Sequence, residues 1–246
     1  MKNLYQEKYL TNDTEVDINE TLSPIEILKL LQRVTFNHSQ KLDLAHQTML
    51  DRDNAFWVVT KMKYVCNNPI KSNQTLTLKT WTHKPQAVRF VRDLQVKLKN
   101  KVMLNGRSEW CCLDYTTKTL RRSNSITYPE LDMVENKQNK IEFSNLKLET
   151  TEKDYAYTKQ IMATDLDVNM HTNNLKYSVI ALDSFTAEEL KSLEIKEYEI
   201  YFVNESYFGD VIKIYKKHFK NYWYIEGKTE NKSIFKVVIK TKKGRN

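Results

Sequence analysis

Hydrophobic and polar residues alternate along eight segments of the chain, which predicts eight long β-strands in two sets of four. The segments are rich in Val, Thr and aromatic residues, which favour strands, and short polar turns separate them. The first set covers residues 55–65, 74–81, 88–98 and 107–114, and the second covers residues 196–204, 210–219, 222–229 and 233–242. A shorter strand is predicted at residues 5–10.

A predicted helix comes before each set of four strands. In the first half, Ser23 and Pro24 form a favourable helix start, and Glu26 completes a capping-box pattern. In the second half, Asn173 or Asn174 is the expected cap of a helix with the same spacing of apolar residues. One long helix followed by an antiparallel sheet that wraps it, twice in succession, predicts an α+β architecture.

The two halves also share a sequence repeat. Residues 14–19 read Thr-Glu-Val-Asp-Ile-Asn and residues 164–169 read Thr-Asp-Leu-Asp-Val-Asn, so six consecutive positions agree in kind at an offset of 150. We therefore expect one domain at residues 1–122 and a second at residues 150–246. A polar and weakly patterned linker at residues 123–149 would join them.

The repeated segment of the second half alternates two kinds of side chain. Its polar set is Asp165, Asp167, Asn169 and His171, and its apolar set is Leu166, Val168 and Met170. In an extended strand these sets project to opposite faces, which would give a polar wall with the groups that a hydrolytic site requires. An ordinary edge strand whose polar face meets water explains the same alternation, so the spacing alone leaves both interpretations open.

Composition and charge exclude several classes of protein. The 246 residues are 40% hydrophobic, as in globular proteins, and they contain no apolar run of about 18 residues that could span a membrane. The N-terminus is polar and has no signal sequence, so we expect a cytoplasmic protein without membrane contact. The formal net charge of +8 predicts an acidic partner, but no nucleic-acid-binding motif accompanies it.

The sequence predicts neither a cofactor nor a metal. With only four glycines, no Gly-rich phosphate-binding motif can be written. The three cysteines, Cys66, Cys111 and Cys112, have neither a disulfide framework nor the spacing of a zinc site, which indicates buried structural thiols.

The segment from Asp165 to Tyr177 closely resembles the signature of acyl-ACP thioesterases of the plant and bacterial type. It reads Asp-Leu-Asp-Val-Asn-Met-His-Thr-Asn-Asn-Leu-Lys-Tyr, and the run Asp-x-Asn-x-His-Thr-Asn-Asn with a following Tyr makes the match specific. Residues 56–62 and 89–93 are similar to strands of that family's first domain, and the resemblance covers nearly the whole chain. It implies two tandem hotdog domains and hydrolysis of the thioester that links a fatty acyl group to acyl carrier protein (ACP).

The resemblance also implies the site residues. The Asp, Asn and His of the motif and a Glu on a later strand carry over to Asp167, Asn169, His171 and Glu205. Either Asp167 or Glu205 would activate water. His171 would position that water, stabilise charge or protonate the leaving sulfur, and the amide of Asn169 would orient the substrate. Many plant members have Cys directly after the Glu, whereas this chain has Ser206, so no catalytic cysteine is expected.

Comparison of the two halves predicts a single catalytic site. The first half has Thr21 at the position of His171 and Asn67 or Asn68 around the position of Glu205. We therefore expect a catalytic second half and a first half whose cavity holds the acyl chain. The candidates for lining this cavity are Leu31, Trp57, Val59, Met62, Trp81 and Phe90.

The implied partner is acyl carrier protein, an acidic protein that suits the positive charge of this chain. The candidates for its docking face are Arg89, Arg92, Arg121, Arg122 and Lys176. An acyl-CoA thioesterase and a non-catalytic, acyl-carrier-binding protein of the same fold are open alternatives. Nothing in the sequence distinguishes a monomer from a homodimer.

Overall fold

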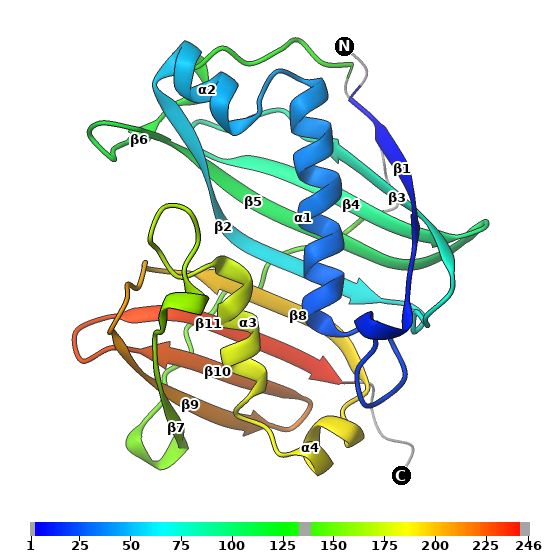
Figure 1. The fold of residues 1–246 in the computed structure, drawn as a ribbon, viewed down its shortest axis with the longest axis vertical. Coiled ribbons are helices and arrows are strands. Elements are labelled where there is room, and N and C mark those ends of the chain that lie inside the picture. The colour runs from blue at the N-terminus through cyan, green and yellow to red at the C-terminus, as the bar shows by residue number, and fades with distance from the viewer. Residues whose placement is uncertain (1–2, 133–138, 242–246) are drawn as a thin grey trace.

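The computed structural model describes residues 3–132 and 139–241, and it contains one continuous antiparallel sheet with two helices on one face (Figure 1). The strand order among these residues is β1-β3-β4-β5-β2-β8-β11-β10-β9-β7, with β6 paired to β5. The first half supplies β1 (Tyr5–Leu10), α1 (Pro24–Lys41), α2 (His46–Asp53), β2 (Ala55–Cys66), β3 (Thr75–Thr82), β4 (Phe90–Leu98), β5 (Lys101–Asp114) and β6 (Leu120–Arg121). The second half supplies β7 (Tyr155–Gln160), α3 (Asn174–Leu182), α4 (Ala187–Ser192), β8 (Ile195–Phe202), β9 (Val211–Phe219), β10 (Tyr222–Lys228) and β11 (Ser233–Thr241).

The predicted α+β architecture is confirmed. All eight long strands form, with ends shifted by one or two residues except that β5 begins six residues before its predicted start. Each half wraps its strands around one central helix, α1 or α3, in a double hotdog arrangement. The prediction for the second helix is wrong in length. The helix that begins at Asn174 stops at Leu182, and the separate helix α4 follows, because Thr186 caps a new start by accepting a hydrogen bond from the N–H of Glu189.

Local sequence explains where the central helices begin. The Oγ of Ser23 accepts a hydrogen bond from the N–H of Glu26 at 3.2 Å, and Pro24 takes the first helical position of α1. In α3, the Oδ1 of Asn173 accepts from the N–H of Leu175 at 3.0 Å. Both helices bury an apolar face in one core that contains residues of both halves.

The two halves are joined through the middle of the sheet. Strands β2 and β8 pair antiparallel, with Lys61 opposite Tyr201 and Val65 opposite Glu197. At the same junction, the rings of Tyr64 and Tyr198 stack with centroids 5.6 Å apart, and both side chains are buried. The pairing makes the sheet and its core continuous across the repeat.

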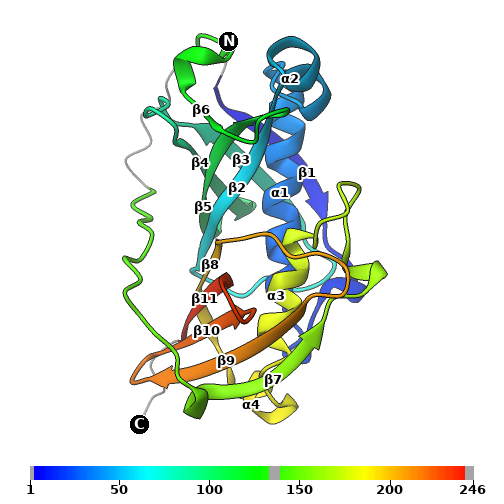
Figure 2. The same cartoon turned by 90° about the vertical axis from the view of Figure 1, so that its left-hand side faces the viewer.

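Residues 139–150, here called the strap, run in extended form over the outer face of the sheet, opposite the helices (Figure 2). The Nζ of Lys63 donates to the carbonyl oxygen of Glu142 at 2.9 Å, and the carboxylate of Glu199 accepts from the N–H and Oγ of Ser144 at 2.7 and 2.8 Å. Coverage of this face explains why charged outer-face residues are buried, among them Lys63, Asp93, Glu109, Glu199 and Glu226.

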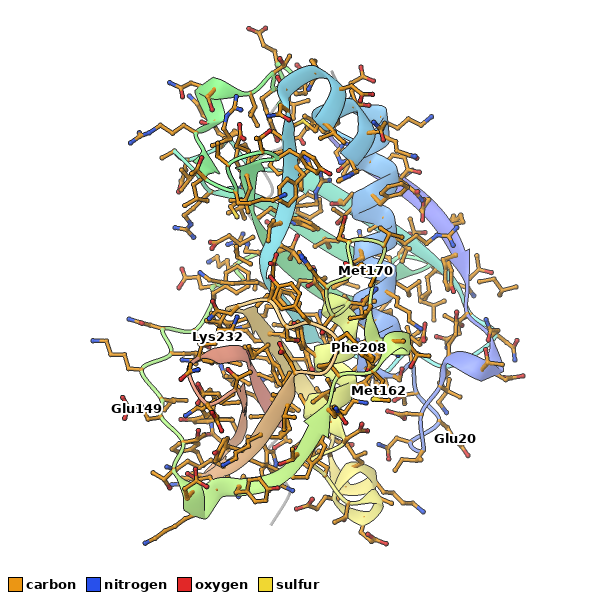
Figure 3. All side chains as sticks on the ribbon, turned by 60° about the vertical axis from the view of Figure 1, so that its left-hand side comes forward. Glu20, Glu149, Met162, Met170, Phe208 and Lys232 are labelled. Carbon is orange, nitrogen blue, oxygen red and sulfur yellow. The ribbon has the colours of Figure 1, made fainter. Side chains whose placement is uncertain are left out.

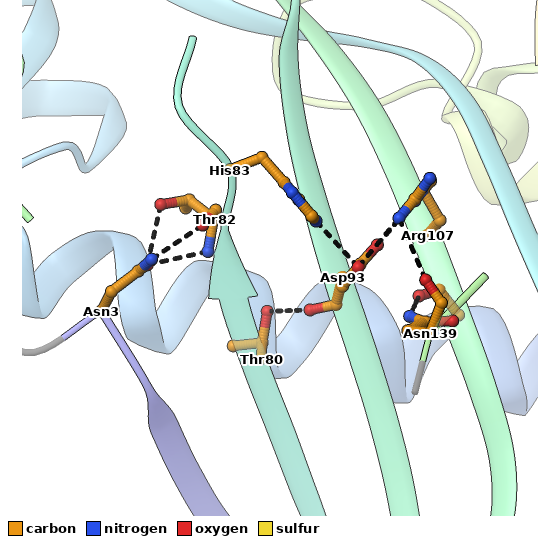
Figure 4. A network of polar contacts seen from close by, with 8 residues as sticks. Asn3, Thr80, Thr82, His83, Asp93, Arg107 and Asn139 are labelled. Atoms are coloured by element: carbon orange, nitrogen blue, oxygen red, sulfur yellow. Dashed lines mark hydrogen bonds and ion pairs between the residues drawn. The ribbon is translucent and has the colours of Figure 1, made fainter. Parts of the chain in front are cut away.

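Asp93 lies at the centre of one such outer-face network (Figure 4). Its carboxylate accepts from Arg107 through Nε at 2.6 Å and Nη2 at 2.9 Å, and it lies 2.8 Å from Nε2 of His83. Asn139 of the strap donates from Nδ2 to the carbonyl oxygen of Gly106 at 3.0 Å. A buried carboxylate is therefore matched by cationic and polar groups.

No helix of the described residues is both long and apolar enough to cross a membrane.

Candidate active site

The motif around His171 forms a tight turn, and the predicted strand is wrong. Residues 163–165 form a short 3-10 helix, and Leu166 pairs with Thr172 in an isolated bridge that closes the turn. The apolar residues predicted to enter the core at positions 168 and 170 are 97% and 66% exposed. The alternation of polar and apolar residues led to the wrong prediction of a strand, because an exposed turn can have the same alternation in its sequence.

Asp167 holds this turn together. Its Oδ1 accepts from the N–H of Asn169 at 2.8 Å and from the N–H of His171 at 3.4 Å, and its own N–H donates to the carbonyl oxygen of His171 at 2.8 Å. The side chain of Asn169 is exposed. The carboxylate of Asp167 is thus committed to the backbone that presents His171.

The first half contains the same turn, which confirms the sequence repeat in three dimensions. There the Oδ1 of Asp17 accepts from the N–H of Asn19 at 2.9 Å, and the N–H of Asp17 donates to the carbonyl oxygen of Thr21 at 2.9 Å. Glu20, directly before Thr21, has a φ of 55°, and Met170, directly before His171, has a φ of 62°. Because Asp17 makes these bonds without a nearby catalytic histidine, shaping the turn is a sufficient reason for Asp167.

His171 and Glu205 are brought together by two loops. The Nδ1 of His171 lies 3.4 Å from Oε1 of Glu205, and the two side chains are 35% and 51% exposed. Tyr207 contacts both: its hydroxyl donates to Oε2 of Glu205 at 3.1 Å, and its ring packs edge-on against the imidazole with centroids 5.1 Å apart. Burial and the neighbouring Glu205 raise the pKa of the Tyr207 hydroxyl, which keeps it a donor.

Backbone hydrogen bonds fix the relative position of these loops. The N–H of Thr172 donates to the carbonyl oxygen of Ser206 at 2.9 Å. In the first half, the equivalent N–H of Leu22 donates to the carbonyl oxygen of Ile70 at 2.7 Å. This correspondence aligns Glu205 with Pro69. Asn68 and Asn67, which were predicted around that position, lie one and two residues before it, and Pro69 at the position itself provides no carboxylate.

Ser206 is a buried part of the framework. Its Oγ lies 2.7 Å from Oγ1 of Thr172 and 2.9 Å from the hydroxyl of Tyr177, which also accepts from the N–H of Ser206 at 3.1 Å. Burial raises the pKa of Tyr177, so its hydroxyl stays protonated. These bonds tie the loop that carries Glu205 to the first turns of α3.

We expect Ser206→Ala to lower stability far more than catalysis. The change leaves hydroxyls of Thr172 and Tyr177 with one partner fewer in a buried place, which typically costs about 1–3 kcal/mol. Urea unfolding would measure this loss, and kcat for thioester hydrolysis should stay within about tenfold of wild type, a change that corresponds to roughly 1.4 kcal/mol. A loss of several orders of magnitude in kcat with an unchanged unfolding midpoint would instead indicate a chemical role for Ser206.

Asp165, which opens the motif, is a structural carboxylate. Its side chain is buried, accepts from the N–H of Met162 at 3.0 Å, and lies 3.1 Å and 3.5 Å from the ammonium groups of Lys159 and Lys176. Burial favours its neutral form, but the Met162 hydrogen bond and the lysines outweigh burial and lower the pKa of Asp165. The charged form therefore anchors the start of the motif to α3.

The two loops that carry His171 and Glu205 also present a set of exposed apolar side chains, here called the apolar rim. It consists of exposed side chains from the two loops, namely Met162, Val168, Met170, Tyr207 and Phe208. Figure 3 shows Met162, Met170 and Phe208 along one side of the second half. Exposed apolar groups gathered in this way are typical of a surface that binds another molecule.

A cavity of about 320 Å³ in the first half, here called the first cavity, opens toward the start of α3. Its apolar walls come from α1, β2, β4 and β5 and include Phe36, Trp57, Val59, Phe90 and Trp110. Asn174, the first residue of α3 and three positions after His171, lines it from the second half. The helix N-terminus, with its backbone N–H groups and positive dipole end, thus lies between the motif and the cavity.

The structure places only part of the predicted lining at this cavity. Trp57, Val59 and Phe90 line it. Leu31, Met62 and Trp81 are buried in the core and do not, because their side chains pack directly against neighbouring elements. Phe36, Trp110 and Tyr128 were not predicted, since helical spacing and strand alternation show which residues face inward and not which inward positions leave a void.

The basic residues predicted to bind the carrier protein do not form one continuous surface of unpaired charges. Three of them lie within ion-pair distance of a carboxylate: Arg89 with Glu109, Arg121 with Asp114 and Lys176 with Asp165. Arg122 is exposed. Arg89 and Arg122 come from neighbouring loops, since the N–H of Ser123 donates to the carbonyl oxygen of Ala87 at 2.7 Å.

Arg92 does not belong to the exposed surface, so the prediction that it contacts a docked protein is wrong. It is only 6% exposed, points inward from β4 and lines the first cavity. Its Nη1 lies 2.6 Å from Nδ1 of His38 on α1. Burial lowers the pKa of Arg92 to about 10, which still leaves it charged at neutral pH. Strand alternation starting from Phe90 already indicated this inward orientation.

Comparisons with known proteins agree with the fold and the motif. Residues 2–127 match the acyl-ACP thioesterase N-terminal domain and residues 147–246 match the acyl-ACP thioesterase C-terminal domain. The oleoyl-acyl carrier protein thioesterase of Coriandrum sativum is 24% identical over 224 residues, which are 85% of this chain and 61% of that protein. The chain thus spans less than two thirds of the length of this curated relative.

Two solved structures have the same fold over nearly their whole length. An acyl-ACP thioesterase from Bacteroides thetaiotaomicron superposes with a TM-score of 0.86 at 20% identity, and the match covers 98% of both chains. The 12:0-ACP thioesterase from Umbellularia californica superposes with a TM-score of 0.82 at 16% identity, again over 98% of each chain. With both of its domains matched in order, the chain belongs to the acyl-ACP thioesterase family.

Proposed function

We propose that this protein hydrolyses the thioester of a fatty acyl group carried by acyl carrier protein, releasing the free fatty acid and the carrier. The observation that carries the proposal is the pairing of His171 with Glu205 beside the N-terminus of α3, whose first residue lines the apolar first cavity. An imidazole–carboxylate pair, backbone donors and a cavity for an alkyl chain are the parts that thioester hydrolysis needs.

In the proposed mechanism, Glu205 acts through His171. With Nδ1 facing the carboxylate, the imidazole keeps a proton on Nδ1, and its Nε2 has the lone pair that takes a proton from water. The oxygen of that water forms a bond to the thioester carbonyl carbon, and the resulting oxyanion is stabilised by the N–H of Asn174 and the positive dipole end of α3. The C–S bond then breaks, and the proton on Nε2 passes to the departing thiolate.

The remaining motif residues position this pair. Asp167 shapes the turn that presents His171, so of the two carboxylates considered from the sequence, Glu205 is the one that faces the imidazole. Tyr207 holds the second oxygen of Glu205. Asn169 is exposed at the tip of the turn, where its amide can reach a bound substrate.

Two surface features favour a carrier protein as the vehicle of the acyl group. The apolar rim lies on the same two loops as the pair and can receive the pantetheine arm. Acyl carrier proteins are acidic, and the net charge of +8 and the exposed Arg122 complement them. Arg89, Arg121 and Lys176 add positive charge, although each has a carboxylate neighbour.

A substrate comparison tests the function. Purified protein should release fatty acid from a panel of acyl-ACP substrates with a higher kcat/KM than from the same acyl chains on coenzyme A, and the advantage should shrink as salt screens the charges. Arg122→Glu should raise KM for acyl-ACP and leave KM for acyl-CoA unchanged. Equal kcat/KM for both carriers at every salt concentration would identify an acyl-CoA thioesterase, and binding without release would identify a non-catalytic acyl-carrier-binding protein.

A further inference from the structure

The molecule contains a second cavity at the place where the internal repeat predicts one. It measures about 570 Å³ and lies beside the first-half turn that contains Asp17. Its walls are mainly apolar and come from both halves, including Ile25, Ile70, Val179, Leu182 and Leu193. This space is distinct from the first cavity, with which it shares no lining residue.

Equivalent residues of the repeat line both cavities. Pro24 begins α1 and lines the second cavity, and Asn174, 150 positions later, begins α3 and lines the first. Gln32 of α1 lines the first cavity, and Leu182 of α3, again 150 positions later, lines the second. In each case the start of one central helix meets a cavity alongside the other helix, so the two cavities are related by the same duplication as the two turns.

The second cavity lacks the chemical groups of the proposed active site. Thr21 and Pro69 stand at the positions of His171 and Glu205, and both line this cavity. Its turn is also closed against the second half, since the Nδ2 of Asn19 donates to the carbonyl oxygen of Leu190 at 3.1 Å. The duplicated site has therefore kept a cavity, but Thr21 and Pro69 provide no equivalent of the imidazole of His171 or the carboxylate of Glu205.

The two cavities differ in the charge of the residues that line them, and therefore in the ligands that they can bind. The charged group that lines the first cavity is the guanidinium of Arg92. Three carboxylates, from Asp17, Asp183 and Glu194, line the second cavity against one ammonium group, from Lys191. An alkyl chain with an uncharged head can enter both, whereas the carboxylate of a free fatty acid is repelled by the acidic lining of the second.

We propose that the second cavity is a non-catalytic binding site for an alkyl chain with an uncharged head group, such as the chain of an acyl thioester or ester. The alkyl class of ligand rests on the proposed function of the first cavity and on the structural equivalence of the two. The site would distinguish the esterified chain from the fatty acid that hydrolysis releases.

A chain-matched pair of probes tests this site. In equilibrium dialysis, decan-1-ol should bind at two molecules per chain and decanoate at one. Ile25→Trp fills the second cavity and should reduce the decan-1-ol stoichiometry to one without loss of hydrolysis. Val179→Phe, a smaller change on the opposite wall, should do the same if the first variant folds poorly. One decan-1-ol per wild-type chain would overturn the proposal, and two molecules of decanoate would overturn the assigned head group.

The thiol of Cys66 reports where the chain binds, because it lines the second cavity. Decan-1-ol should slow its reaction with N-ethylmaleimide by about tenfold or more, as expected when [L] is at least ten times Kd. Cys111, which lines neither cavity and is likewise partly buried, is the internal control when modification is mapped by mass spectrometry. Equal protection of both thiols, or of neither, would contradict the proposal.

A variant of the first cavity separates this inference from the proposed function. Ala45→Phe fills the first cavity and should impair hydrolysis while Cys66 stays protected by decan-1-ol. If wild-type protein binds two molecules of decan-1-ol but hydrolyses no acyl-ACP, the proposed function fails and the second site stands. If it hydrolyses acyl-ACP and binds one molecule, the second site fails alone.

Discussion

Replacing His171 by Ala should reduce kcat for acyl-ACP hydrolysis by roughly 10²–10⁴-fold, the usual contribution of a positioned acid–base group. In the proposed mechanism, the imidazole accepts the proton of water in the first step and returns it to sulfur in the second. KM should change little, because the proposed binding sites of the acyl chain and of the carrier do not depend on the imidazole. Steady-state release of fatty acid from a saturating acyl-ACP substrate measures the effect.

Glu205→Gln should show a loss of the same order, because the amide cannot stabilise the imidazolium that forms next to it. If the two residues work as one unit, the double variant should be no slower than His171→Ala alone. His218→Ala and Glu230→Gln, which change an exposed histidine and an exposed glutamate outside the site, are matched controls and should retain full activity. Additive losses in the double variant would show that the two side chains act independently.

Tyr198→Ala should destabilise the whole molecule by about 3–5 kcal/mol, the typical cost of removing a large buried aromatic side chain. Tyr198 is buried at the junction of β2 and β8, where its ring stacks on Tyr64 of the other half. Because the core is continuous across this junction, both halves should unfold together at a lower denaturant concentration. Urea unfolding followed by circular dichroism and by tryptophan fluorescence measures the shift.

Two comparisons make that experiment decisive. Tyr198→Phe keeps the stacked ring and should cost much less, and Tyr155→Ala removes a tyrosine that is 48% exposed on the edge strand β7. If Tyr198→Ala instead produced two separate transitions, with the first half unfolding at its original midpoint, the halves would be independent units that merely touch.

Features encoded by neighbouring residues were the ones that the sequence predicted well. The start of α1 followed from Ser23 and Pro24, because Ser23 caps the N–H of Glu26 within one helical turn. The predicted capping box does not form, since the N–H of Ser23 donates to the carbonyl oxygen of Glu15 and not to the side chain of Glu26. The long strands followed from alternation. Strand β7 was missed, although an offset of 150 from β1 places it at residues 155–160. The repeat thus held information about the fold that local patterning did not provide.

The candidate site shows where such prediction ends. The resemblance identified His171 and Glu205, and the structure brings them within 3.4 Å. Tyr207, which holds Glu205, and the hydroxyl network of Ser206 carry no sequence pattern that singles them out. Their roles depend on the contact between two loops far apart in the chain. Arg92 on β4 and His38 on α1 are likewise far apart in the chain, so their contact could not be predicted, although strand alternation indicated that Arg92 points inward.

The strap contacts the sheet in good part through its main chain. Lys63 and Arg107 donate to carbonyl oxygens of the strap, and Tyr224 donates to that of Leu148. A carbonyl oxygen is present whatever the side chain, so most of these interactions would survive substitution of the residues that provide them. The number of residues in this connection should therefore be under stronger selection than their identity, since an insertion or deletion would shift every carbonyl away from its buried partner.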